Sequence, residues 1–258
     1  MTQITQTENP ARPAATVIVL RPSTRSRDAV RDESSLRAGE GDPFELLMVR
    51  RNDKMAFMGG SYVFPGGRVD DADRPQHGSV LAAARFPDLS DEDEATYRTA
   101  AVRELAEEAN VRITPADLEP LAHWVTPQVE TRRFDTRFFL ARMPAGQVAK
   151  HDEGETTALE WLTPRGAVAK FERRELLLPP PTWTTIRQLE KLSSIADVFA
   201  WARARKIVRV MPGFIKNDTG TMLTLPGDPL YPTIADWEVP EETRFVLEEG
   251  ARWQPLKP

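Results

Sequence analysis

The chain has 258 residues, of which 40% are hydrophobic and 28% charged, and its formal net charge is −5. This length suits one globular domain with extensions, or at most two small domains. A net negative charge does not favour binding to nucleic acid or to an anionic membrane surface, since both partners are negatively charged. The sequence holds no cysteine, which excludes disulfides and thiolate metal sites, so any metal must sit on oxygen or imidazole ligands. With neither a signal segment nor a long apolar run, we expect a cytoplasmic protein.

The first third of the chain predicts strands separated by polar connections. Residues 1–13 predict a flexible tail, and the β-branched and apolar runs at residues 15–20 and 44–51 predict strands. The polar segment between these strands predicts a surface insertion. A short apolar run at residues 62–64 leads into a turn with Gly66 and Gly67, where the missing side chains let backbone approach a ligand closely.

The periodicity becomes helical after Ser90. Ser90 and Asp93 have the spacing of a capping box, and Asn110 can adopt the left-handed conformation that ends a helix. On a helical wheel the apolar residues lie on one side, which can pack on a sheet, and three glutamates lie roughly opposite. The apolar set is Ala95, Val102, Leu105 and Ala109, and the acidic set is Glu104, Glu107 and Glu108.

The rest of the chain mixes both kinds of element. Residues 118–127 and 132–144 predict strands, and residues 156–171 predict a strand that runs into a helix capped by Thr163 and Pro164. Residues 182–192 and 194–206 predict amphipathic helices. The tail from Ile207 is β-prone, but its strand pairing cannot be derived from the sequence. This mixture predicts an α/β or α+β sandwich.

The three glutamates at positions i, i+3 and i+4 require an explanation. Like charges at this spacing destabilise an isolated helix by about 0.2–0.5 kcal/mol a pair. A solvated acidic face is the ordinary interpretation. The alternative is a divalent cation site, because clustered carboxylates and water suit Mg²⁺ or Mn²⁺, and a diphosphate can complete the coordination. Arg103, four residues before Glu107, is positioned to relieve part of the repulsion.

The segment from Gly67 to Val111 resembles the Nudix box, G-x5-E-x7-R-E-U-x-E-E-x-G-U, where U is a bulky aliphatic residue. The glycine is followed by R-E at Arg103 and Glu104, then by E-E at Glu107 and Glu108. The match is interrupted by an insertion at residues 74–95. Asp73 stands where the first glutamate of the box belongs, and Glu94 is the alternative. Asn110 replaces the second glycine.

An interrupted box resembles the branch of Nudix hydrolases typified by the mammalian peroxisomal coenzyme A diphosphatase. The resemblance implies a Nudix-type α/β/α sandwich with a mixed sheet, here at residues 14–175. A helical and extended C-terminal extension, residues 176–258, is expected to pack on it. It also implies Mg²⁺- or Mn²⁺-dependent cleavage of a nucleoside diphosphate-linked compound, with coenzyme A or acyl-coenzyme A as the first substrate to test.

The resemblance implies roles for the acidic residues. Glu104, Glu107 and Glu108 are the expected metal ligands, and Arg103 is expected to orient a glutamate. Glu104 is one choice for the base that activates water, and Glu155 in the later acidic loop is another. Glu153 is a neighbour of Glu155 with the same chemistry, and an exposed acidic loop is the alternative to a catalytic role.

Substrate contacts are expected from the glycine turn and from arginines. Gly66 and Gly67 offer unobstructed backbone, and Arg51 and Arg133 are candidate phosphate ligands because a guanidinium fork matches phosphate oxygens. Arg50 is a further candidate. Ordinary surface salt bridges are the alternative for all three arginines.

Other functions stay open from the sequence alone. They are a diphosphatase for ADP-ribose or a nucleotide sugar, and a binding module that has kept the Nudix scaffold without strong catalysis. The expected partner is a small diphosphate, with neither nucleic acid nor membrane involved. A homodimer is compatible with the sequence, which leaves the oligomeric state undetermined.

Overall fold

The computed structural model describes residues 9–23, 44–55, 58–75, 85–152, 154, 156–218, 220–232 and 234–258. The predicted insertion between the first two strands and much of the box insertion therefore lie outside the described residues. The strands are β1 (Arg12–Pro22), β2 (Phe44–Arg51), β3 (Tyr62–Val63), β4 (Gly66–Arg68), β5 (Glu119–Val125), β6 (Phe134–Arg142), β7 (Thr156–Leu162), β8 (Arg209–Val210), β9 (Gly213–Asn217), β10 (Gly220–Thr224), β11 (Arg244–Leu247) and β12 (Trp253–Leu256). The α-helices are α1 (Asp91–Ala109), α2 (Pro164–Glu172), α3 (Pro180–Leu189) and α4 (Ile195–Ala204).

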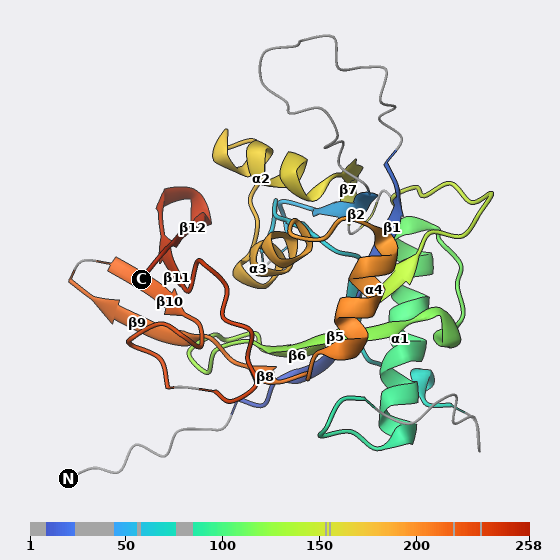
Figure 1. Cartoon of the computed structure of the whole chain (residues 1–258), viewed down its shortest axis with the longest axis horizontal. Coiled ribbons are helices and arrows are strands. Elements are labelled where there is room, and N and C mark those ends of the chain that lie inside the picture. The colour runs from blue at the N-terminus through green and yellow to red at the C-terminus, as the bar shows by residue number, and fades with distance from the viewer. Residues whose placement is uncertain are drawn as a thin grey trace.

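A mixed sheet of eight strands forms the centre of the described part of the chain (Figure 1). Its main path is β3-β2-β1-β6-β5-β8, with β4 paired to β1 and β7 paired to β2. β1 runs parallel to β6 and β5 runs parallel to β8, while the other pairs are antiparallel. β1 is long enough to pair with three strands, β6, β2 and β4, and it therefore connects the two halves of the sheet.

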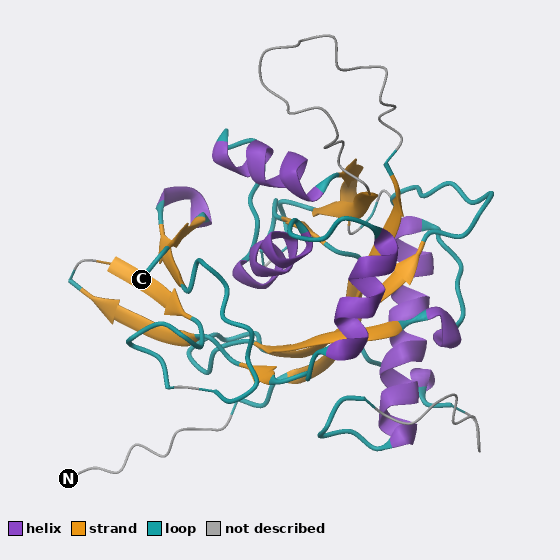
Figure 2. Cartoon of the chain, in the orientation of Figure 1, coloured by secondary structure: helices purple, strands orange, loops and turns teal. Residues whose placement is uncertain are grey.

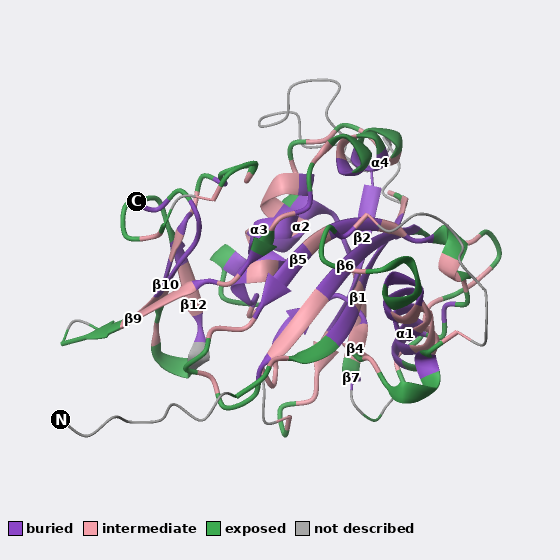
Figure 3. Cartoon of the chain, turned by 90° about the horizontal axis from the view of Figure 1, so that it is seen from below, coloured by how far each residue is buried: buried purple, intermediate pink, exposed green. Residues whose placement is uncertain are grey.

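Helices cover both faces of this sheet. α1 packs on one face, where Ala15, Val17 and Val19 of β1 are fully buried, and the alternate residues Ile18 and Leu20 face the opposite core. That second core is covered by α2, α3 and α4. Figure 2 distinguishes the helices from the strands by colour, and Figure 3 shows the buried strands between α1 and the other helices. The predicted Nudix-type α/β/α sandwich with a mixed sheet is confirmed.

Local sequence determines both ends of α1. Ser90 accepts a hydrogen bond from the backbone of Asp93 at 3.1 Å, and its hydroxyl donates to the Asp93 carboxylate at 2.7 Å. Asn110 has φ 52° and ψ 32°, the left-handed conformation that ends the helix. Both predicted caps are therefore present. Because α1 begins at Asp91, the last five residues of the predicted box insertion belong to the helix instead.

The N-terminal boundary also differs from the prediction. β1 begins at Arg12, inside the segment predicted as a flexible tail. The Arg12 backbone N–H donates to the Arg133 carbonyl at 2.9 Å, and the Asn9 amide donates to the Glu130 and Thr131 carbonyls. The Arg12 bond extends the parallel β1–β6 ladder and the Asn9 bonds fix the chain before it, long-range contacts that composition does not reveal.

The chain after residue 176 joins the main core. β8 adds a strand to the central sheet beside β5, and β9–β12 form a separate antiparallel sheet. Leu223 and Phe245 of that second sheet are buried in the same core as α3. Trp237 packs edge-on against Trp124 of β5, with ring centroids 5.9 Å apart. Within the described residues, no helix is long and apolar enough to cross a membrane.

The end of the box insertion is anchored on the sheet. Phe86 is 1% exposed and packs edge-on against Phe139 of β6 at 5.5 Å. The buried Arg137 guanidinium donates to Asp88 at 2.7 Å, and the Glu94 carboxylate accepts the backbone N–H groups of residues 85 and 86. The chain returning from the insertion is thus fixed before α1 begins.

Candidate active site

The Arg103 guanidinium binds three carboxylates of the interrupted box. Its Nε and Nη2 donate to the two oxygens of Asp73 at 2.9 and 3.0 Å. Its Nη1 donates to Glu104 Oε1 at 2.8 Å and to Glu107 Oε2 at 3.0 Å. Hydrogen bonding to Asp73, followed by that to Glu104, raises the pKa of Arg103 above its ordinary value. The structure therefore relieves the crowding of acidic residues with a guanidinium from the same helix.

The geometry distinguishes the two candidates for the first acidic position of the box. Asp73 ends a short 3₁₀ helix, is 2% exposed, and forms the bidentate pair with Arg103. Glu94 instead accepts two hydrogen bonds from Arg98, at 3.0 and 2.7 Å, and caps the returning insertion. Asp73 therefore lies in the acidic cluster, and Glu94 fixes the end of the insertion where the chain returns to α1.

The glycine turn lies directly against α1. The Gly66 backbone N–H donates to Glu108 Oε2 at 2.9 Å. A Cβ on Gly67 would lie 2.4 Å from the Glu104 carboxylate carbon, closer than any side chain tolerates. A side chain at position 67 would displace the Glu104 carboxylate, so the glycine allows Glu104 to lie against the turn and brings the two halves of the box together.

The three glutamates that lie opposite the apolar residues of α1 differ in burial. Glu104 is 9% exposed and Glu108 is 5% exposed, while Glu107 is exposed to solvent. The β4 turn covers the flank of α1 that carries Glu104 and Glu108, so that these two carboxylates are buried against backbone. The helical wheel shows only the angle around the helix and not which neighbouring segment lies there.

The donor chemistry of this cluster fits a hard divalent cation. Glu104 and Glu107 already direct oxygens at one cationic nitrogen, and Glu108 lies one turn further along α1. Such oxygen donors are the ligands that Mg²⁺ and Mn²⁺ prefer. Within the described residues no three acidic or histidine side chains are gathered closely enough to hold a metal as they stand.

The end of β2 and the start of β7 lie beside each other at the same end of the sheet as the glycine turn. Arg51 opposes Thr156, and the Asn52 amide donates to the Gly154 carbonyl at 3.3 Å. Glu155 and Glu153 lie outside the described residues, but their neighbours Gly154 and Thr156 lie next to Arg51. Among the described residues, the buried Arg51 Nε has no hydrogen-bond partner.

The other two arginines make structural contacts. Arg50 donates to Asp53 at 2.7 Å and to Thr157 at 3.1 Å. Arg133 is 9% exposed, and its guanidinium donates to the backbone carbonyls of Asn9, Thr126 and Pro127. The contacts of Arg133 fix the β5–β6 connection, and none of them joins it to Arg103 or the glutamates.

Sequence reasoning missed a hydrogen-bonded group beside Arg50. Tyr62 in β3 donates to Glu160 Oε1 at 2.7 Å, and Lys170 of α2 donates to the other carboxylate oxygen. Burial, followed by the Glu160 hydrogen bond, raises the pKa of Tyr62 to about 12, so the phenol stays neutral at physiological pH. No local motif signals this group, because its members come from three elements.

The fold and the cluster of carboxylates bonded to Arg103 can be compared with known proteins. The model of the NUDIX domain family matches residues 35–177, more than half of the chain. The chain belongs to the Nudix family. A crystal structure of a NUDIX hydrolase from Alicyclobacillus acidocaldarius aligns over 74% of this chain and 96% of that one, with a TM-score of 0.58 and 22% identity. This likeness supports the fold.

Two curated relatives carry the same printed name, acyl-coenzyme A diphosphatase NUDT19. The human protein is 27% identical over 305 aligned positions, which cover 84% of this chain and 81% of that protein. The Xenopus laevis protein is 24% identical, covering 83% and 80%. The prediction that this chain is a Nudix hydrolase similar to coenzyme A diphosphatases is thereby confirmed.

Replacing Asp73 with Asn will show how much the Arg103 pair contributes to stability. The amide keeps the size of the carboxylate but loses its charge and turns an N–H group toward the guanidinium. We expect the free energy of unfolding to fall by about 1–3 kcal/mol, measured by urea denaturation. The control is Asp71→Asn in the same 3₁₀ helix, whose side chain is fully exposed and whose replacement should cost less than about 0.5 kcal/mol. Equal stabilities of the two variants would contradict this assignment.

Proposed function

We propose that this Nudix hydrolase is a Mg²⁺- or Mn²⁺-dependent diphosphatase that cleaves coenzyme A or acyl-coenzyme A within its diphosphate. The observation that carries the proposal is the similarity to human acyl-coenzyme A diphosphatase NUDT19 across most of both chains. The hydrogen bonds from Arg103 to Glu104 and Glu107, beside the Gly66–Gly67 turn, support it.

Glu104, Glu107 and Glu108 are the proposed ligands of the cation. When bound, the cation supplies charge neutralisation for the diphosphate. Arg103 holds Glu104 and Glu107 in position, and the turn at Gly66 and Gly67 holds Glu104 and Glu108 close to its backbone. Arg51, which opposes Thr156 at the same end of the sheet, is proposed to bind phosphate. The contacts of Arg133 support a structural role for that arginine.

Hydrolysis of the anhydride needs one proton acceptor. The oxygen of water forms a bond to one phosphorus, the bond from that phosphorus to the bridging oxygen breaks, and the departing phosphate carries the bridging oxygen away. A carboxylate accepts the proton that water loses. Glu155 and Glu104 are the two proposed bases.

Glu107→Gln is the variant that tests metal binding with the least disturbance of the fold, because Glu107 is the exposed member of the cluster. We expect Mn²⁺ binding measured by calorimetry to weaken and Mg²⁺-dependent turnover to fall by about a hundredfold or more, since a charge-stabilising group is lost. Glu92→Gln, at an exposed position on the same helix, should change neither quantity. Unaltered turnover in Glu107→Gln would disprove the metal assignment.

A substrate panel tests the choice of diphosphate. The protein with Mg²⁺ is incubated with coenzyme A, acetyl-coenzyme A, ADP-ribose or NADH, and the products are identified by mass. We expect adenosine 3′,5′-bisphosphate with 4′-phosphopantetheine or its acetylated form. Turnover of ADP-ribose alone would select the alternative diphosphatase, and no turnover of any compound would select the binding module. Glu107→Gln serves as the blank for contaminating activity.

The base is tested by the pH dependence of kcat. If Glu155 accepts the proton, Glu155→Gln lowers kcat and removes the decline of kcat on the acidic side of the profile, because that decline reports protonation of the base. Glu153→Gln is the matched control and should keep the wild-type profile. A wild-type profile for Glu155→Gln would transfer the role to Glu104.

A further inference from the structure

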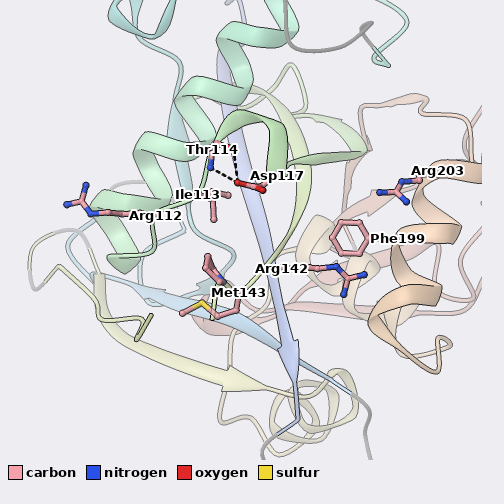
Figure 4. Close-up of a pocket in the computed structure, with 9 residues that line it drawn as sticks. Arg112, Ile113, Thr114, Asp117, Arg142, Met143, Phe199 and Arg203 are labelled. Atoms are coloured by element: carbon pink, nitrogen blue, oxygen red, sulfur yellow. Dashed lines mark hydrogen bonds between the residues drawn. The ribbon is translucent and has the colours of Figure 1, made fainter. Parts of the chain in front are cut away.

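A hollow of about 580 Å³ lies away from the acidic cluster, between the segment after α1, the end of β6 and α4 (Figure 4). Arg142 and Arg203 contribute guanidinium groups, and Ile113, Met143 and Phe199 contribute apolar surface. Volumes of about 300–1,000 Å³ are usual for sites that bind small molecules. The hollow therefore has the size and the mixed lining of a ligand site.

The guanidinium groups are held by an aromatic ring. Arg142 lies 4.6 Å and Arg203 lies 5.8 Å from the centre of the Phe199 ring, measured from the guanidinium carbon. Figure 4 shows both arginines beside this ring. Phe199 is 6% exposed, so the ring is a fixed support and not a free stacking surface. Stacking reduces the entropy that the arginines lose when an anion binds.

Two carboxylates near the hollow already accept hydrogen bonds. The Asp117 carboxylate accepts hydrogen bonds from the backbone and hydroxyl of Thr114, both at 2.8 Å, and these bonds lower the pKa of Asp117. Glu119 accepts a hydrogen bond from Arg203 at 2.7 Å and is also paired with Arg85. Among the described residues, Arg142 has no carboxylate partner. The lining therefore carries three guanidinium groups, of Arg112, Arg142 and Arg203, against the single carboxylate of Asp117.

The register of the sheet separates this hollow from the acidic cluster. Ala15 of β1 lies between Gly67 of β4 and Arg137 of β6, whereas Arg142 opposes Leu20. Five residues along a strand correspond to about 16 Å. A phosphate held by Arg142 would not be the diphosphate that lies against the Gly67 turn.

We propose that this hollow binds a phosphorylated small molecule, with its phosphate on Arg142 and Arg203 and its apolar body against Ile113 and Met143. A guanidinium fork donates two hydrogen bonds to phosphate oxygens, which a lysine in its place would not do with fixed geometry. The site does not depend on the diphosphatase function, since it uses none of the residues assigned to that reaction.

Calorimetric titration of the whole protein with AMP in metal-free buffer tests the site. AMP is a phosphate monoester with a flat aromatic base and contains no anhydride to hydrolyse. We expect wild-type protein to bind AMP, Arg142→Gln to bind it about tenfold or more weakly, and inorganic phosphate to compete. Arg173→Gln makes the same charge change at an exposed position after α2 and should bind AMP like the wild type.

Three results would overturn the proposal. The first is the same affinity for Arg142→Gln as for wild type, and the second is no binding of AMP to wild type at about 1 mM, the weak end of specific affinities. The third is equal binding of adenosine, which lacks the phosphate. Glu107→Gln separates this site from the acidic cluster, because it should leave AMP binding unchanged. Loss of AMP binding in Glu107→Gln with retention in Arg142→Gln would place the ligand in the acidic cluster.

Discussion

The Arg103 guanidinium is the group on which the candidate active site depends. Two carboxylates about 4 Å apart repel by roughly 4 kcal/mol at the effective dielectric constant of a protein surface. Arg103 places positive charge between such groups, since Asp73, Glu104 and Glu107 all accept its hydrogen bonds. Its Nη2 also donates to the Arg68 carbonyl at 2.9 Å. One side chain thus offsets part of the negative charge of the cluster and joins α1 to the glycine turn.

The contact of Arg103 with the glycine turn explains how the box accommodates an insertion. The two halves of the motif are held by the contacts of Arg103 on one side, and the returning chain is fixed by Phe86 and Glu94 on the other. The entropy cost of closing a loop grows only with the logarithm of its length, about 0.6 kcal/mol for each doubling. A longer connection between fixed ends therefore costs little, and the geometry of the glutamates is independent of its length.

The sequence predicts the features that local interactions determine. The caps at Ser90 and Asn110, the N-cap at Thr163 and most strand positions follow from residues within a few positions of each other. Features that depend on tertiary contacts do not follow from the sequence. The burial of Glu104 and Glu108 follows from the β4 turn, and the role of Arg133 follows from carbonyls on two separate segments. A helical wheel or a charge count holds no information about either neighbour.

The core extends beyond the part of the chain that matches the family. The match ends at residue 177, yet the sheet face opposite α1 is covered by α3, α4 and the buried Phe245. The apolar residues of that face need this cover, because burying them is the main favourable term in folding. α4 also supplies Phe199 and Arg203 to the hollow, while β6 supplies Arg142. The extension therefore completes the core and, by the same packing, creates a basic hollow that the Nudix domain alone would lack.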